Sequence, residues 1–70
     1  MVYVFLADGF EEMEALGTVD ILRRAQIDVQ TVSVTGEKVV TSSHHVPVYA
    51  DILLFMQVLC SSAVYILTHS

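Results

Sequence analysis

The sequence has few of the residues that small proteins use for cross-links or for binding polyanions. Its single cysteine, Cys60, excludes an internal disulfide. Arg23, Arg24 and Lys38 are its only strong cations and the formal net charge is −5, which excludes a basic patch for nucleic acid. The three histidines and the cysteine lack the paired spacing of a zinc site. We therefore expect no metal and no cofactor.

The amino terminus also lacks a basic region and a small-residue cleavage site, so it does not have the pattern of a secretory signal. The cytoplasm is the expected compartment. With 54% hydrophobic and 16% charged residues, the chain is too apolar for a disordered tail. Its 70 residues amount to about half of a common domain, and one core of this size rarely supplies more than about 3–5 kcal/mol.

The first half of the chain has the pattern of a strand, a helix and a second strand. Val2 to Ala7 is a short apolar run without alternation, typical of a strand covered on both faces of a parallel sheet. From Phe10 to Gln26 the period becomes helical, with a predicted buried stripe. That stripe comprises Ala15, Val19, Leu22 and Ala25 or Gln26, and Asp20 can pair with Arg23 and Arg24. Ile27 to Thr35 predicts the second strand, and the order is that of a βαβ unit.

The elements expected after that unit are short. Gly36 to Lys38 predicts a turn. Residues 39–41 and 46–49 predict either a short hairpin or an extended excursion, and Pro47 disfavours a central strand position there. Ile52 to Ser70 contains no charged residue apart from His69. We expect it to end in a buried strand at residues 63–67, and a membrane span over Ile52 to Thr68 is the weaker alternative.

The acidic stretch Asp8 to Ala15, DGFEEMEA, carries the most specific signal. With Val19-Asp20, Arg23-Arg24-Ala25, Ser42-Ser43-His44 and Ala50-Asp51, it resembles the first βαβ unit of the ThiJ/PfpI superfamily. The closest branch is the DJ-one group of deglycases, glyoxalases and redox stress chaperones, which is related to class I glutamine amidotransferases. The resemblance implies an α/β fold: the start of a flavodoxin-like three-layer sandwich with a mostly parallel sheet.

The resemblance also implies a role for the third glutamate of the motif. In that family it lies beside a reactive cysteine as a protonated carboxyl that serves as general acid/base, and here this position is Glu14. Burial and a neighbouring thiolate favour the neutral carboxyl, which can donate a hydrogen bond. Glu11 and Glu12 are expected to form a solvated helix start.

The sequence departs from the family pattern in several places. It has no Ala-x-Cys-x-Gly elbow for the nucleophile, and Cys60 lies between apolar residues as a small hydrophobe would. Gln26 and His45 stand where the family usually has glycine. Residues 68–70, Thr-His-Ser, stand where it has Pro-Gly-Gly. We expect residues 1–70 to be a partial domain, truncated before the cysteine elbow; a truncated gene, a degraded copy or a truncated gene model would each produce it.

Three hypotheses for function follow. The first is a catalytically inactive piece of a cysteine-dependent enzyme that acts on glyoxal-type carbonyls or glycated thiols and amines. The second is a non-enzymatic module that forms a homodimer or pairs with a full-length relative. The third is a small membrane protein.

His44 and His45 are expected to be loop histidines, because adjacent strand residues face opposite ways and no acidic residue lies at ligand spacing in the sequence.

Overall fold

The computed structural model describes residues 1–54 and the backbone of residues 64–67. In chain order its elements are β1 (Val2–Leu6), α1 (Glu12–Arg24), β2 (Val29–Ser33), β3 (Val39–Thr41), β4 (Pro47–Tyr49), β5 (Ile52–Leu53) and β6 (Val64–Leu67). The predicted strands, helix and hairpin are all present. The strand β5 was not predicted, because two residues carry no periodicity.

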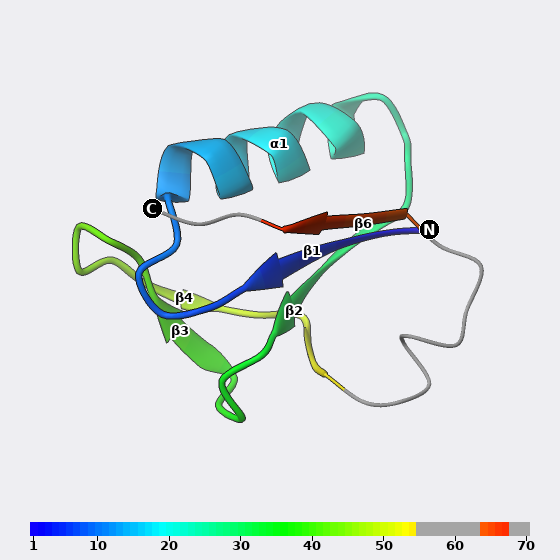
Figure 1. Cartoon of the computed structure of the whole chain (residues 1–70). Coiled ribbons are helices and arrows are strands. Elements are labelled where there is room, and N and C mark those ends of the chain that lie inside the picture. Colours follow the sequence, from blue (N-terminus) through cyan, green and yellow to red (C-terminus); the bar gives the residue numbers. More distant parts are fainter. Residues whose placement is uncertain (55–63, 68–70) are drawn as a thin grey trace.

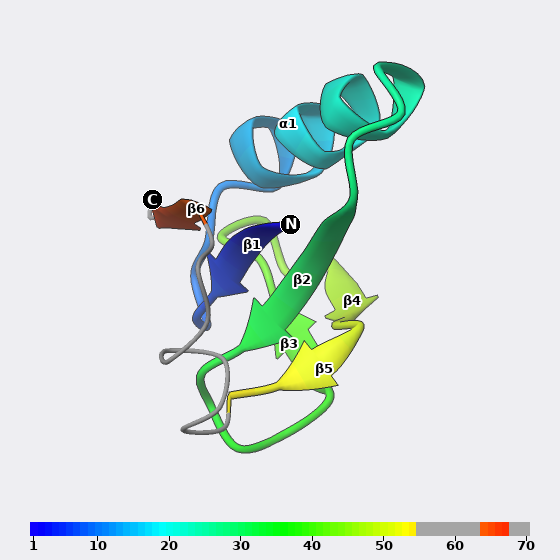
Figure 2. The ribbon, with the colours of Figure 1, turned by 90° about the vertical axis from the view of Figure 1, so that its right-hand side faces the viewer.

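Four strands form one parallel sheet in the order β5-β2-β1-β6, and α1 lies along one face of it (Figures 1 and 2). Phe5 of β1 pairs with Val32 on one side and with Leu67 on the other. The α/β fold with a mostly parallel sheet is therefore confirmed. No helix within residues 1–54 and 64–67 is long and apolar enough to cross a membrane, and residues 55–63 and 68 of the alternative span lie outside the described residues.

The core lies between the helix and the sheet. Val4 and Leu6 of β1 are fully buried, and Ala15 and Val19 of α1 pack in the same cluster. In β2 three consecutive residues, 31–33, are buried, as expected of an inner strand covered on both faces. The predicted helical stripe was too long: Leu22 packs against the core, but Ala25 and Gln26 are exposed because the helix has ended.

The helix is shorter than predicted at both ends, and each end has a physical cause. Glu11 is the N-cap, and its side chain accepts the N–H of Met13 at 2.8 Å. At the other end Gln26 has a left-handed backbone, with φ of 62°. Its N–H donates to the carbonyl of Arg23, and the N–H of Ile27 donates to that of Leu22. This pair of hydrogen bonds is a Schellman motif, which normally contains glycine at the left-handed position.

The two arginines at the end of α1 have different partners. Arg24 pairs with Asp20 at 3.1 Å, as predicted. Arg23 does not pair with Asp20; its guanidinium donates to Asp51 at 2.9 Å and to the Val29 carbonyl at 3.1 Å. Asp51 lies just before β5, so this ion pair joins the helix to the outermost strand of that side of the sheet. The prediction for Arg23 was wrong because a tertiary partner replaced a local one.

Candidate functional site

The order of the strands marks one end of the sheet as the place for a site. From β1 the chain proceeds to β2 and β5 on one side, whereas β6 lies on the other side of β1. The direction of winding therefore reverses between β1 and β6. In open α/β sheets, ligands bind outside the carboxyl ends of the strands at such a switch point. Figure 1 shows that the carboxyl ends of β1 and β6 and the start of α1 lie at this same end.

The loop between β1 and α1 is held against the β3–β4 hairpin by backbone hydrogen bonds. The N–H of Gly9 donates to the Thr41 carbonyl at 2.8 Å, and the N–H of Ser43 donates to the Phe10 carbonyl at 2.8 Å. Phe10 is fully buried and not helical, because it fills the core beside this hairpin. Gly9 has φ of 89°, a conformation that favours glycine. These contacts fix where the acidic first turn of α1 begins.

Glu14 lies in the first turn of α1, at the switch point. Its side chain is exposed, and among the described residues no hydrogen bond or ion pair involves its carboxylate. Its carbonyl accepts the hydroxyl of Thr18 at 2.5 Å. The position agrees with a carboxyl that is available to another group. Its inherited role beside a cysteine stays a prediction, and Cys60 lies outside the described residues.

Glu12 has an environment that the sequence did not suggest. Its carboxylate Oε1 lies 2.5 Å from Nδ1 of His44, in the loop between β3 and β4. The Glu12 side chain is only 19% exposed, whereas that of His44 is 71% exposed. The expectation of a solvated Glu12 was therefore wrong. His44 is a loop histidine, as predicted, but the hairpin brings it to an acidic residue 32 positions earlier in the chain.

The electrostatics of Glu12 favour its charged form. The hydroxyl of Ser42 is the main cause that holds the pKa of Glu12 below its ordinary value; burial opposes this effect, and His44 adds to it. The second carboxylate oxygen, Oε2, is nevertheless buried and makes no hydrogen bond of good geometry to the described residues. The result is an ionised carboxylate with one oxygen unsatisfied.

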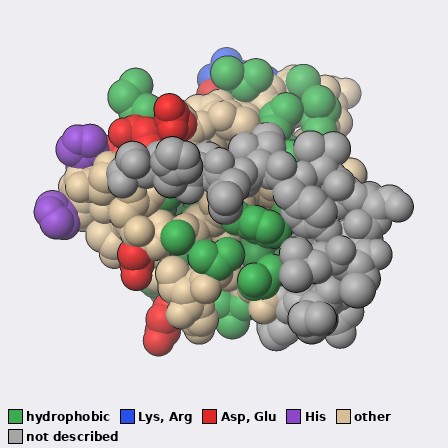
Figure 3. Space-filling model, in the orientation of Figure 1, with side chains coloured by type: hydrophobic (Ala, Val, Ile, Leu, Met, Phe, Trp, Pro, Cys, Tyr) green, Lys and Arg blue, Asp and Glu red, His purple; other side chains and the backbone are tan. Residues whose placement is uncertain are grey.

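Glu11 completes a cluster of three possible ligands. Glu11 is half-buried at the helix start. One donor atom from each of Glu11, Glu12 and His44 lies within 4.8 Å of the other two. The sequence analysis missed this cluster because it compared spacings along the chain. Histidine and acidic side chains gather at the end of the molecule where α1 begins (Figure 3).

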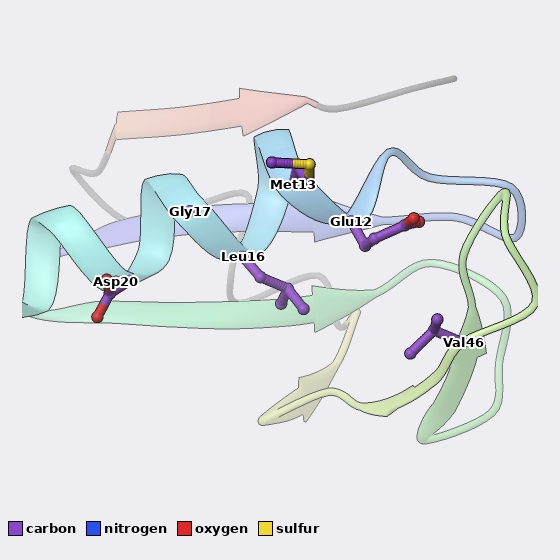
Figure 4. Close-up of a pocket in the computed structure, with 6 residues that line it drawn as sticks. All are labelled: Glu12, Met13, Leu16, Gly17, Asp20 and Val46. Atoms are coloured by element: carbon purple, nitrogen blue, oxygen red, sulfur yellow. The ribbon is translucent and has the colours of Figure 1, made fainter.

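An open groove of about 450 Å³ runs along α1 from Glu12 to Asp20. Its lining residues are Glu12, Met13, Leu16, Gly17, Asp20 and Val46 (Figure 4). Met13 is 81% exposed, although it is a large apolar residue. In the close-up, Glu12 extends from α1 toward the loop that carries Val46. The groove thus combines an apolar helix face with one wall from the hairpin loop.

A parallel α/β sheet with a helix on one face and an acidic helix start at the switch point defines a flavodoxin-like protein. The sequence also matches the profile of the DJ-1/PfpI family over residues 1–66. The chain belongs to the DJ-1/PfpI family.

Individual relatives agree with this assignment. The chain is 40% identical over 53 residues to Protein DJ-1 homolog B of Arabidopsis thaliana. This match covers 76% of the chain and 12% of the relative. A crystal structure of a cysteine-to-alanine mutant of the DJ-1 superfamily protein STM1931 from Salmonella typhimurium is 50% identical, with a TM-score of 0.72. It covers 74% of this chain, and this chain covers 28% of it.

Oxidised DJ-1 of Toxoplasma gondii matches nearly the whole chain, 99%, with 31% identity and a TM-score of 0.84. The matched part is 38% of that protein. The chain therefore spans well under half the length of each of these relatives.

Proposed function

We propose that this chain supplies the amino-terminal part of a DJ-1/PfpI active site, in which Glu14 is the carboxyl beside a cysteine nucleophile. The observation that supports this most is the place of Glu14: exposed, in the first helical turn after β1, at the switch point between β1 and β6. The 70 residues contain no cysteine elbow. We therefore propose that the chain alone is catalytically inactive.

The chemistry proposed for the complete site follows from the two groups. A thiolate is a stronger nucleophile than a thiol, and a neutral carboxyl beside it can donate a hydrogen bond and then transfer a proton. Carbonyl compounds of the glyoxal type, and thiols or amines glycated by them, are the proposed substrates. A role in the stress response and a cytoplasmic location belong to the same proposal.

A chimera tests the role of Glu14. The segment of STM1931 that aligns with this chain is replaced by the corresponding residues here, so that the cysteine of the relative faces Glu14. Turnover of methylglyoxal and the pH dependence of cysteine alkylation are then measured. Glu14→Gln should lower turnover by about 100-fold or more and shift the alkylation profile, as the loss of a general acid/base does. Asp20→Asn, an exposed change on the same helix, is the control.

Retention of turnover and of the alkylation profile in the Glu14→Gln chimera would overturn the role of Glu14. The purified 70-residue chain should show no turnover with methylglyoxal. Turnover that Glu14→Gln abolishes in the 70-residue chain would overturn the proposed inactivity.

The groove along α1 favours a second candidate function, pairing with a second copy or with a full-length relative. Met13 is a large apolar residue that is mostly exposed, and Leu16 and Val46 continue its surface within the groove. Gly17 adds no side chain there, which allows a close approach of another backbone. Sedimentation velocity and capture of a tagged full-length relative test this pairing.

Met13→Glu should abolish the pairing, because it places a charge in the apolar contact. Ile21→Glu is the matched control: it is an exposed apolar residue of the same helix that does not line the groove. A chain that stays monomeric and captures no relative would contradict this second function, as would equal effects of the two variants.

A further inference from the structure

We propose that Glu11, Glu12 and His44 bind a divalent transition-metal ion, for which Zn²⁺ is the best-matched candidate. Their donor atoms lie within 4.8 Å of one another. Ligands of one tetrahedral zinc ion lie about 3.4 Å apart, since zinc–nitrogen and zinc–oxygen bonds are about 2.1 Å long. Nδ1 of His44 and Oε1 of Glu12 are closer than this, at 2.5 Å, so an ion between them would separate this pair. The exposed His44 ring has room for that movement.

One carboxylate oxygen of the cluster takes no part in the ion pair between Glu12 and His44. Oε1 of Glu12 contacts His44, but Oε2 is buried and has no hydrogen-bond partner in the described part of the chain. Glu11 uses Oε1 to accept the N–H of Met13 and retains its second oxygen. A cation beside these oxygens would satisfy the buried Oε2 and balance the two carboxylates.

The donor set distinguishes among cations. Calcium and magnesium prefer oxygen ligands throughout, whereas an imidazole nitrogen with two carboxylates suits zinc and its neighbours. The N-terminus of α1 carries about half a positive charge from the helix dipole, and this charge opposes the binding of any cation. Two carboxylates outweigh that contribution, and exposure of His44 leaves the remaining coordination positions to water. An ion bound here would cross-link the helix to the hairpin loop.

Calorimetric titration of the untagged 70-residue chain with ZnCl₂ tests the site. Cys60→Ser is introduced throughout, so that a thiol outside the described residues does not contribute. One equivalent of zinc should bind. Glu12→Gln and His44→Asn should each weaken binding at least about tenfold, because even the loss of an outer-shell partner costs that much. Two matched controls should bind as the parent does: Glu14→Gln on the same helix and His45→Asn in the same loop.

Backbone NMR of the parent chain provides a second measurement that does not depend on the folding of any variant. Zinc should shift the amide resonances of residues 11–13 and 42–46 and leave those of β2 unchanged. Failure to bind one equivalent, binding unaffected by Glu12→Gln and His44→Asn, or shifts located elsewhere would each overturn the proposal. The site needs neither Glu14 nor a cysteine, so its failure leaves the proposed function of Glu14 intact.

Discussion

The guanidinium of Arg23 donates to Oδ2 of Asp51 at 2.9 Å, and the same oxygen accepts the N–H of Thr31 at 2.9 Å. The Thr31 hydroxyl in turn accepts the N–H of Asp51 at 2.8 Å. One carboxylate thus connects the last turn of α1, the middle of β2 and the residue before β5. The Ala50-Asp51 part of the family motif therefore has a structural role, away from the acidic end of the sheet.

Replacing this carboxylate should destabilise the fold. Asp51→Asn removes the charge that Arg23 and Thr31 contact, and hydrogen bonds to charged groups contribute about 1.5–3 kcal/mol. Since the Asp51 side chain is 39% exposed, we expect a loss of about 1 kcal/mol in the free energy of unfolding. Urea unfolding followed by circular dichroism measures it. Asp20→Asn, which removes only the exposed pair with Arg24, should cost less than about 0.5 kcal/mol. Equal losses in the two variants would contradict this prediction.

The same carboxylate should make stability depend on pH. Partial burial raises the pKa of Asp51, but the hydrogen bonds from Thr31 and the charge of Arg23 outweigh it and hold the pKa below 3.8. Because the folded pKa is the lower one, the stabilisation is present above pH 3.8 and is lost as the pH falls through the folded value. The difference in unfolding free energy between the parent chain and Asp51→Asn should therefore shrink as the pH falls below 3.8. A constant difference across this range would refute the assignment.

Two glycine-to-alanine substitutions should have opposite effects. Neither Gly9 nor Gly17 has an atom within 4 Å of an added Cβ, so the backbone conformation alone should determine the change in stability. Gly9 has φ of 89°, and Gly9→Ala should destabilise the chain by about 1–2 kcal/mol. Gly17 is inside α1, and Gly17→Ala should stabilise it by up to about 1 kcal/mol. Thermal unfolding of the two variants compares them directly, and effects of the same sign would show that side-chain space matters after all.

Gln26→Gly and His45→Gly should each stabilise the chain. Both residues have a left-handed backbone, with φ of 62° and 65°, which costs a residue with a side chain about 1 kcal/mol. Glycine removes that cost and keeps the Schellman hydrogen bonds at the end of α1. Asp28→Gly is the control, because Asp28 is exposed and does not have a positive φ. It should destabilise the chain in the same urea titration, and a gain in Asp28→Gly equal to that in Gln26→Gly would contradict the explanation.

Sequence reasoning was most successful for elements whose signal is local. The helical period, the apolar run of β1 and the two halves of the hairpin predicted α1, β1, β3 and β4 within two residues at each end. Comparison with the family pattern singled out Gln26 and His45, and both have positive φ. The strand β5 could not be predicted, because two residues are held there by pairing with β2 rather than by their own pattern.

The candidate site was harder to predict, because its partners are distant in the chain. Glu12 and His44 are 32 residues apart, and neither has a local signal for the other. Arg23 and Asp51 are 28 residues apart, and a local partner, Asp20, was the simpler expectation. The assignment of Glu14 came from the family motif, and its role beside a cysteine stays a prediction. A search for ligands at short spacing along the chain would have missed the cluster of Glu11, Glu12 and His44, because the hairpin brings its members together.

The hydrogen bonds that join the loop at Gly9 and Phe10 to the hairpin at Thr41 and Ser43 bear on how the chain folds. These contacts close a loop of more than thirty residues, so they form only after the entropy of closing it has been overcome. Helix formation alone therefore cannot bring His44 to Glu12. The distance between those two side chains reports when the tertiary structure, rather than the helix, has formed in a refolding experiment.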